Sequence, residues 1–175
     1  MMRKPAMAIA GALLLVLAGC AGAPTQEEAK AWSAIAGRYP RGHGFKLQQR
    51  VTLVALGKEY PMLASLAVAP DGRWRMQAGS ELGGRLFDLL GDTATAQVLA
   101  APQGMGAKPL LQGLAQDLRV LYLGQAPACQ SLALVGPYGF SLENHCWHYR
   151  LEVHDLKIRP GAPPASAFAT PTPAP

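Results

Sequence analysis

The chain has 175 residues, of which 50% are hydrophobic and 15% charged, and its formal net charge is +5. Once an apolar leader is set aside, about one domain's worth of sequence remains, which is enough to bury a hydrophobic core. Arg3 and Lys4 belong to that leader, so the remaining chain is only mildly basic and slightly favours anionic membrane surfaces. Because no basic run interleaved with aromatic residues is present, we expect no nucleic-acid partner.

The first segment has the three-part pattern of a secretory signal: two cations, an apolar run over residues 6–18 and small residues at its end. The run is too short to remain as a membrane-spanning helix. Leu17-Ala18-Gly19-Cys20 also resembles a bacterial lipoprotein box, in which the cysteine receives a diacylglyceryl group and becomes the new N-terminus. Such a group, usually with a third acyl chain, meets the requirement of more than one chain for stable anchoring. The alternative is an ordinary cleaved signal followed by an unrelated cysteine.

The residue after Cys20 is Ala21 rather than Asp. By analogy with lipoproteins of bacteria that have two membranes, this predicts a lipid anchor in the outer membrane, with the domain on the periplasmic side. The predicted organisation is a signal peptide over residues 1–19, a tether over 20–30, a single domain over 31–159 and a disordered tail rich in Pro and Ala over 160–175.

Two cysteines remain for the folded domain, Cys129 and Cys146. In an oxidising compartment we expect a disulfide between them that closes a short loop. The chain-entropy estimate of its stabilisation is roughly 3 kcal/mol. The alternative is a reactive thiol pair, although the long spacing differs from a C-x-x-C redox motif.

The first half of the domain predicts antiparallel strands. A short amphipathic turn over residues 31–36 precedes a strand from Phe45 to Ala55, in which apolar and polar residues alternate. A second strand is expected from Tyr60 to Ala69. Asp71-Gly72 then forms a turn to a return strand over residues 73–78.

Another strand pair is expected over residues 85–90 and Thr93 to Ala101, followed by a helix from Lys108 to Leu123. Its apolar stripe is Leu110, Leu114, Leu118 and Leu121, with Asp117 and Arg119 off that stripe.

Strands are then expected from Cys129 to Val135, from Phe140 onward and from Trp147 to Val153. A change of phase at Leu156 and Ile158 indicates a bulge or the edge of the sheet.

The motifs and polar residues of the sequence indicate which kinds of functional site to expect. No G-x-S-x-G, Walker or H-E-x-x-H motif is present, so we expect no enzyme and no cofactor. Asn144-His145-Cys146-Trp147-His148, with His154 farther along, is the one group that suggests a metal site. His148 and His154 would share a polar face but are too far apart for one metal ion without another element, so solvated or hydrogen-bonded histidines are expected. A basic cluster near the tether either meets phospholipid headgroups or is a solvated face; it comprises Arg38, Arg41, His43, Lys46 and Arg50.

The chain resembles an uncharacterised family of bacterial lipoproteins found beside arylpolyene-type lipid biosynthesis genes, and in layout the LolA/LolB lipoprotein carriers. The segments that carry the resemblance span most of the domain: the lipoprotein box, Phe45 to Leu56, Gly84-Arg85-Leu86-Phe87-Asp88-Leu89, Pro109-Leu110-Leu111 with Ala115-Gln116-Asp117-Leu118, and Trp147 to Val153. The resemblance implies an α+β fold, a curved antiparallel sheet forming a half-open barrel, with a helix covering its concave face and an acyl chain as ligand. No residue matches a LolB-type acceptor loop, so moving or retaining an acylated molecule fits better than lipoprotein insertion.

Two functions follow from these patterns. A carrier of a lipid or acylated molecule predicts a dry apolar cavity under the helix. A lipoprotein that binds a protein partner in the envelope predicts a solid core with an exposed apolar patch or open strand edge. The candidate cavity residues are Leu53, Leu66, Trp74, Met76, Leu110, Leu114, Leu118 and Leu151.

Overall fold

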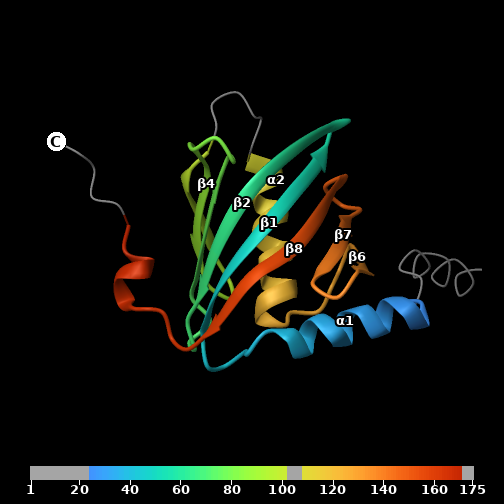
Figure 1. Ribbon diagram of the computed structural model, residues 1–175, viewed down its shortest axis with the longest axis horizontal. Helices are drawn as coiled ribbons and strands as arrows, with labels where there is room; N and C mark the ends of the chain where they lie inside the picture. Colours follow the sequence, from blue (N-terminus) through green and yellow to red (C-terminus); the bar gives the residue numbers. More distant parts are fainter. Residues whose placement is uncertain (1–23, 102–107, 171–175) are drawn as a thin grey trace, which may run out of the picture.

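The computed structural model describes residues 24–101 and 108–170 (Figure 1). The predicted signal peptide, the lipid anchor at Cys20 and the outer-membrane signal at Ala21 lie outside the described residues. The elements in chain order are α1 (Gln26–Arg38), β1 (Phe45–Ala55), β2 (Lys58–Val68), β3 (Trp74–Gly79), β4 (Arg85–Gly91), β5 (Ala96–Ala100), α2 (Lys108–Leu118), the π-helix η1 (Arg119–Leu123), β6 (Gln130–Val135), β7 (Gly139–Asn144), β8 (Tyr149–Pro160) and the 3-10 helix η2 (Ala165–Phe168).

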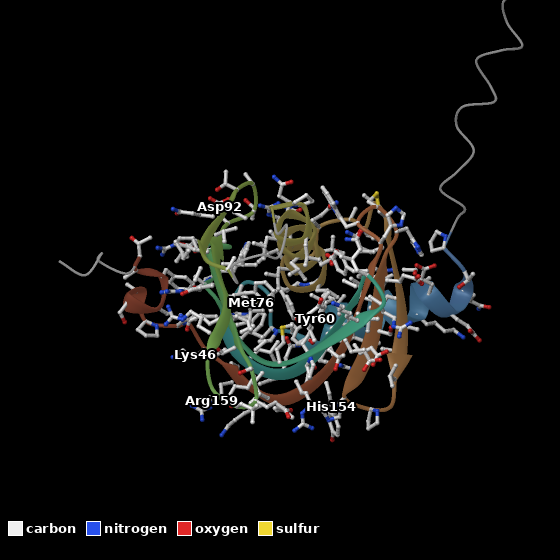
Figure 2. All side chains as sticks on the ribbon, turned by 90° about the horizontal axis from the view of Figure 1, so that it is seen from above. Lys46, Tyr60, Met76, Asp92, His154 and Arg159 are labelled. Atoms are coloured by element: carbon white, nitrogen blue, oxygen red, sulfur yellow. A yellow bond between two sulfur atoms is a disulfide. The ribbon has the colours of Figure 1, made fainter. Side chains whose placement is uncertain are left out.

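The eight strands form one antiparallel sheet in the order β5-β4-β3-β2-β1-β8-β7-β6. The sheet is strongly curved, and α2 lies on its concave side (Figure 2). The edge strands β5 and β6 do not pair with each other, so the sheet remains open. The predicted α+β class, a half-open curved sheet with a helix on its concave face, is confirmed.

The alternation predicted for the first strands is visible in their burial. Along β1 the side chains of Phe45, Leu47, Val51 and Leu53 are buried in the core, while Lys46 and Arg50 are exposed on the convex side. Because successive side chains of a strand point to opposite faces, this pattern gives the sheet one apolar face and one polar face. Helix α2 and η1 then cover the apolar face.

The change of phase predicted near the end of β8 is a β-bulge. Gln49 of β1 pairs with Asp155, and the next residue, Gln48, pairs with Lys157, so Leu156 has no partner. After this extra residue, the side chains of β8 again alternate between the two faces of the sheet, but each position faces the side opposite to the one that unbroken alternation would give. Ile158 therefore packs against the core, and Lys157 and Arg159 are exposed.

The structure differs from the expected disordered tail. Phe168 in η2 is only 8% exposed, and the Arg73 guanidinium lies 5.3 Å from the centre of its ring. Arg75 Nη1 donates hydrogen bonds to the carbonyl oxygens of Ala167 at 3.2 Å and Ala169 at 2.8 Å. A buried aromatic residue with a cation beside it and two hydrogen bonds from Arg75 therefore hold a segment whose composition alone suggested disorder.

Helix α1 also differs from the expectation, because it begins inside the predicted tether. Thr25 caps it by accepting a hydrogen bond from the backbone N–H of Glu28 at 3.2 Å, as Ser and Thr do at helix N-termini. Ala31 and Ile35 on its buried face pack into the core. Among the helices of residues 24–101 and 108–170, none is long and apolar enough to cross a membrane.

Candidate functional site

The concave face of the sheet meets α2 and η1 through apolar side chains. Leu114, Leu118 and Leu121 of the predicted stripe are buried, while Leu110 at the start of the helix is only half-buried. Leu111 and Ala115 are buried as well, so the buried face is wider than the stripe. The helix therefore lies deep inside the curve of the sheet (Figure 2).

A cavity of about 30 Å³ lies between this helix and the sheet. Its lining comes from β1, β2, β3, β4, β8, α2 and η1: Gln49, Val51, Leu53, Met62, Met76, Phe87, Leu89, Leu114, Asp117, Leu118, Leu121, Tyr122, Leu151 and Val153. Pockets that hold small molecules usually enclose about 300 to 1,000 Å³. In this conformation the cavity has room for about one water molecule, so the interface is closed.

The structure brings five of the predicted cavity residues together in this lining: Leu53, Met76, Leu114, Leu118 and Leu151. Leu66 and Trp74 are buried in the same core but do not line the cavity. The Trp74 indole N–H instead donates to the carbonyl oxygen of Asp92 at 3.0 Å. Leu110 packs at the margin of the core.

Sequence reasoning placed Asp117 off the buried face, and this was wrong, because Asp117 is only 1% exposed. Its carboxylate accepts hydrogen bonds from Gln130 Nε2 at 3.0 Å, from Asn144 Nδ2 at 2.8 Å and from the Tyr149 hydroxyl. Burial, offset only in part by these three neutral donors, raises the pKa of Asp117 to about 6. These donors lie on β6, β7 and β8, so the carboxylate fixes α2 to that end of the sheet.

The predicted disulfide between Cys129 and Cys146 is present, with 5.6 Å between the two Cα atoms. Each cysteine lies within two residues of an amide that holds Asp117, namely Gln130 or Asn144. The backbone N–H of His145 also donates to the carbonyl of Cys129 at 2.9 Å. The disulfide therefore joins the two chain segments that position the partners of Asp117.

A second polar cluster fixes η1 to the middle of the sheet. The Tyr122 hydroxyl donates to Gln49 Oε1 at 2.8 Å, and Gln49 Nε2 donates to Asp155 Oδ1 at 2.7 Å. Tyr39, at the end of α1, donates its hydroxyl to Asp155 at 3.0 Å. Burial raises the pKa of both tyrosines, so both hydroxyls stay protonated and act as donors.

The predicted basic cluster near the tether does not form one solvated face. Arg38 forms an ion pair with Asp155 at 3.1 Å, and Arg50 forms one with Glu81 at 3.3 Å. Arg41 Nη2 donates to the carbonyl of Leu121 at 2.7 Å. Exposed Lys46 lies on the convex face, and His43 is exposed in the preceding turn.

The histidines singled out in the sequence lie on the surface. His145, His148 and His154 are all exposed, and the ring of His145 makes a hydrogen bond with the Ser131 hydroxyl at 3.0 Å. In residues 24–101 and 108–170, no three His, Cys, Asp or Glu side chains come together as a set of metal ligands.

No family model matches the chain, and no curated protein matches it. Among solved structures, the chain is similar to one described as "putative outer membrane lipoprotein-sorting protein domain" from Vibrio parahaemolyticus. The TM-score is 0.38 and the identity 7%, over 81% of this chain and 97% of that chain. A similarity this low is not evidence of a shared function.

Proposed function

We propose that this domain binds a lipid, or the acyl chain of an acylated molecule, between α2 and the concave face of the sheet. The observation that carries the proposal is the lining of the cavity, in which, among the described residues, only Gln49, Asp117 and Tyr122 are polar. An apolar lining with a few fixed polar groups is typical of small-molecule sites.

Binding requires α2 to move, because the closed cavity of about 30 Å³ is roughly tenfold smaller than such sites. The second half of the helical segment is fixed by polar contacts of Asp117, Arg119 and Tyr122. In the first half, the described side chains from Pro109 to Leu114 make no hydrogen bond to the sheet. An outward tilt of this first half therefore opens the cavity without breaking either polar cluster.

The sheet residues that line the cavity suit a variable ligand. Met62 and Met76 both line the cavity, and Met76 lies on the inner side of the curved sheet (Figure 2). Methionine is unbranched and flexible, so its side chain can repack around chains of different shape. This favours an acyl chain over a rigid ligand.

The proposal places the domain at the periplasmic face of the outer membrane, anchored through a lipid on Cys20. There it moves or retains an acylated molecule and catalyses no reaction. The buried carboxylates of Asp88, Asp117 and Asp155 are engaged in hydrogen bonds that hold the fold together, so the proposal gives them structural roles.

The test measures uptake of cis-parinaric acid, a fluorescent fatty acid, by the full chain in non-ionic detergent micelles. Leu118→Ala enlarges the cavity from the helix side, so we expect tighter binding of the probe by about four- to fifteenfold, which corresponds to the burial of one or two additional methylene groups. The matched control is Leu142→Ala, because Leu142 is fully buried but lies on β7 outside the cavity lining. We expect similar destabilisation of both variants, with unchanged affinity in the control.

Native mass spectrometry of the same chain, purified from bacterial cells, looks for a co-purifying acyl species. The proposal is overturned if the wild-type chain neither carries an acyl species nor takes up the probe. It is also overturned if Leu142→Ala gains as much affinity as Leu118→Ala, because uptake then reflects partial unfolding and not the cavity.

A second candidate function, binding of a protein partner in the envelope, is favoured by the small volume of the cavity and by the open edge at β6. Leu134 and Val135 at the end of this edge strand are 45% and 59% exposed. An unpaired edge strand can accept a strand from another chain. Failure of both acyl-binding tests would favour this function.

A further inference from the structure

The convex face of the sheet, on the side away from α2, carries a groove of about 360 Å³. Ser65 and Ala67 of β2 are small side chains in its lining, and Ser166 and Ala167 from η2 form one wall. Figure 2 shows Lys46 and Arg159 on this outer side of the curved sheet, whereas Met76 lies on the inner side. The groove is therefore separate from the cavity under the helix.

The strand register places cations side by side in this groove. Lys46 of β1 lies directly opposite Arg159 of β8, and Gln48 lies opposite Lys157. Like charges directly opposite in an antiparallel pair destabilise the sheet. On the other side of β1, Lys46 is paired with Ala67, whose small side chain keeps the space beside the cations open.

The bulge at Leu156 produces this arrangement. If β8 kept a regular alternation through Leu156 with no bulge, Lys157 and Arg159 would point toward the concave core, and Leu156 and Ile158 would face the convex side. Bulges are common where a side chain is redirected next to a functional site. Here the bulge places two cations beside Lys46.

The groove has positive charge without a matching negative charge. None of the lining residues within 24–101 and 108–170 is Asp or Glu. Among the described residues, Lys46, Lys157 and Arg159 form neither an ion pair nor a side-chain hydrogen bond. Arg75, a fourth cation in the lining, is already neutralised by Asp88, with Nη2 and Oδ2 2.8 Å apart. Three cations therefore converge on a groove that supplies no counter-charge.

We infer that this groove binds a phosphate group, either on a lipid headgroup or free in solution. A phosphate oxygen accepts charge-assisted hydrogen bonds from lysine, and arginine can bind two oxygens at once. Ser65 in the lining supplies a neutral donor beside the cations. Repulsion between Lys46 and Arg159 in the empty groove is relieved when the phosphate anion binds.

The experiment uses the full chain in non-ionic micelles with two probes, inorganic phosphate and a short-chain phosphatidylglycerol below its own micelle concentration. Binding is measured by calorimetric titration. The double variant Lys46→Gln/Arg159→Gln is expected to bind both probes about tenfold or more weakly, because charge-assisted hydrogen bonds are lost. The matched control, Lys58→Gln/Arg150→Gln, removes the same charge from exposed positions outside the groove and is expected to bind within about twofold of wild type.

Two readouts separate binding from folding. The charge-retaining swap Lys46→Arg/Arg159→Lys is expected to keep most of the affinity. Because the Lys46→Gln/Arg159→Gln variant loses a repulsive pair, its melting temperature is expected to equal or exceed that of the wild type.

Equal affinity for the two probes identifies free phosphate as sufficient, and tighter binding of the lipid identifies the headgroup. Absence of binding by the wild type, or equal loss in the control variant, would overturn the inference.

Discussion

Two aspartates, Asp88 and Asp117, are both almost inaccessible to solvent but lie in opposite electrostatic settings. Asp88 on β4 is fully buried; although burial opposes ionisation, hydrogen bonds from Arg75 and Gln77 outweigh it and lower the pKa of its carboxyl. Asp117 on α2 has only neutral donors, and burial raises its pKa to about 6. The comparison shows that a cation beside a buried carboxylate can lower its pKa, whereas the neutral donors around Asp117 offset the effect of burial only in part.

The two carboxylates give opposite dependences of stability on pH. The pKa of Asp88 is lower in the folded state than its ordinary value of 3.8, so its stabilisation is present above about pH 4 and is lost as the pH falls. The pKa of Asp117 is higher in the folded state, so its contribution is fully present below about pH 4 and is lost as the pH rises through about 6.

The largest effect is expected from Arg75→Met, which leaves the Asp88 carboxylate buried without its cation. We expect the free energy of unfolding at pH 7 to fall by about 3 to 5 kcal/mol, measured by urea denaturation. The control is Arg150→Gln, which breaks an exposed ion pair with Glu152 and should cost about 1 kcal/mol or less. Equal losses in the two variants would mean that Asp88 is not ionised.

Removing the disulfide tests the surroundings of Asp117, because the disulfide joins the two segments that hold its partners. The double change Cys129→Ser/Cys146→Ser is expected to cost about 3 kcal/mol, because it frees a loop whose ends are 17 residues apart. Hydrogen exchange should speed up at Gln130 and Asn144, which hold Asp117, more than at Gln77, which holds Asp88. A uniform increase along the whole sheet would contradict this local role.

Asp117→Asn should remove the loss of stability at neutral pH. The wild type is expected to lose up to about 3 kcal/mol between pH 4 and pH 7.5 as Asp117 ionises, since each unit of pKa shift corresponds to about 1.4 kcal/mol. Unfolding free energies measured across this range should show a flatter profile for the variant. A profile parallel to that of the wild type would mean that another group causes the slope.

The smallest effect is expected from Tyr149→Phe, which removes one donor to Asp117. At pH 5, where Asp117 is mostly protonated, we expect a loss of about 1 kcal/mol. The midpoint of the pH-dependent loss should move above about 6, because one hydrogen bond that favours the ionised form is gone. Tyr138→Phe, on an exposed tyrosine, is the control and should change neither value.

The sequence predicted those parts of the fold that depend on local periodicity. Alternation predicted β1 and the strands on either side of Asp71-Gly72, and the phase change at Leu156 predicted the bulge. The stripe of leucines predicted that α2 covers an apolar face. These signals are local, because each is set by how neighbouring residues of one element face the core.

The polar clusters could not be predicted in this way. The three donors to Asp117 lie 13, 27 and 32 residues further along the chain, and no spacing rule connects them. A single acidic residue next to an apolar stripe, here Asp117 beside Leu118, was the only local sign. For the same reason, the local sequence around Phe168 predicted a disordered tail, because its contact with Arg73 joins residues that are far apart in the chain.

The strand order has a consequence for how the chain reaches this structure. β1 and β8, which stand near opposite ends of the described sequence, are neighbours in the middle of the sheet. A chain whose synthesis is unfinished holds β1 with one long edge unpaired, and contacts between such distant segments form slowly. β8, the last strand of the described residues, thus joins two separate halves, β2 to β5 on one side and β6 with β7 on the other. A truncation before Tyr149 would therefore split the sheet through its centre instead of trimming its margin.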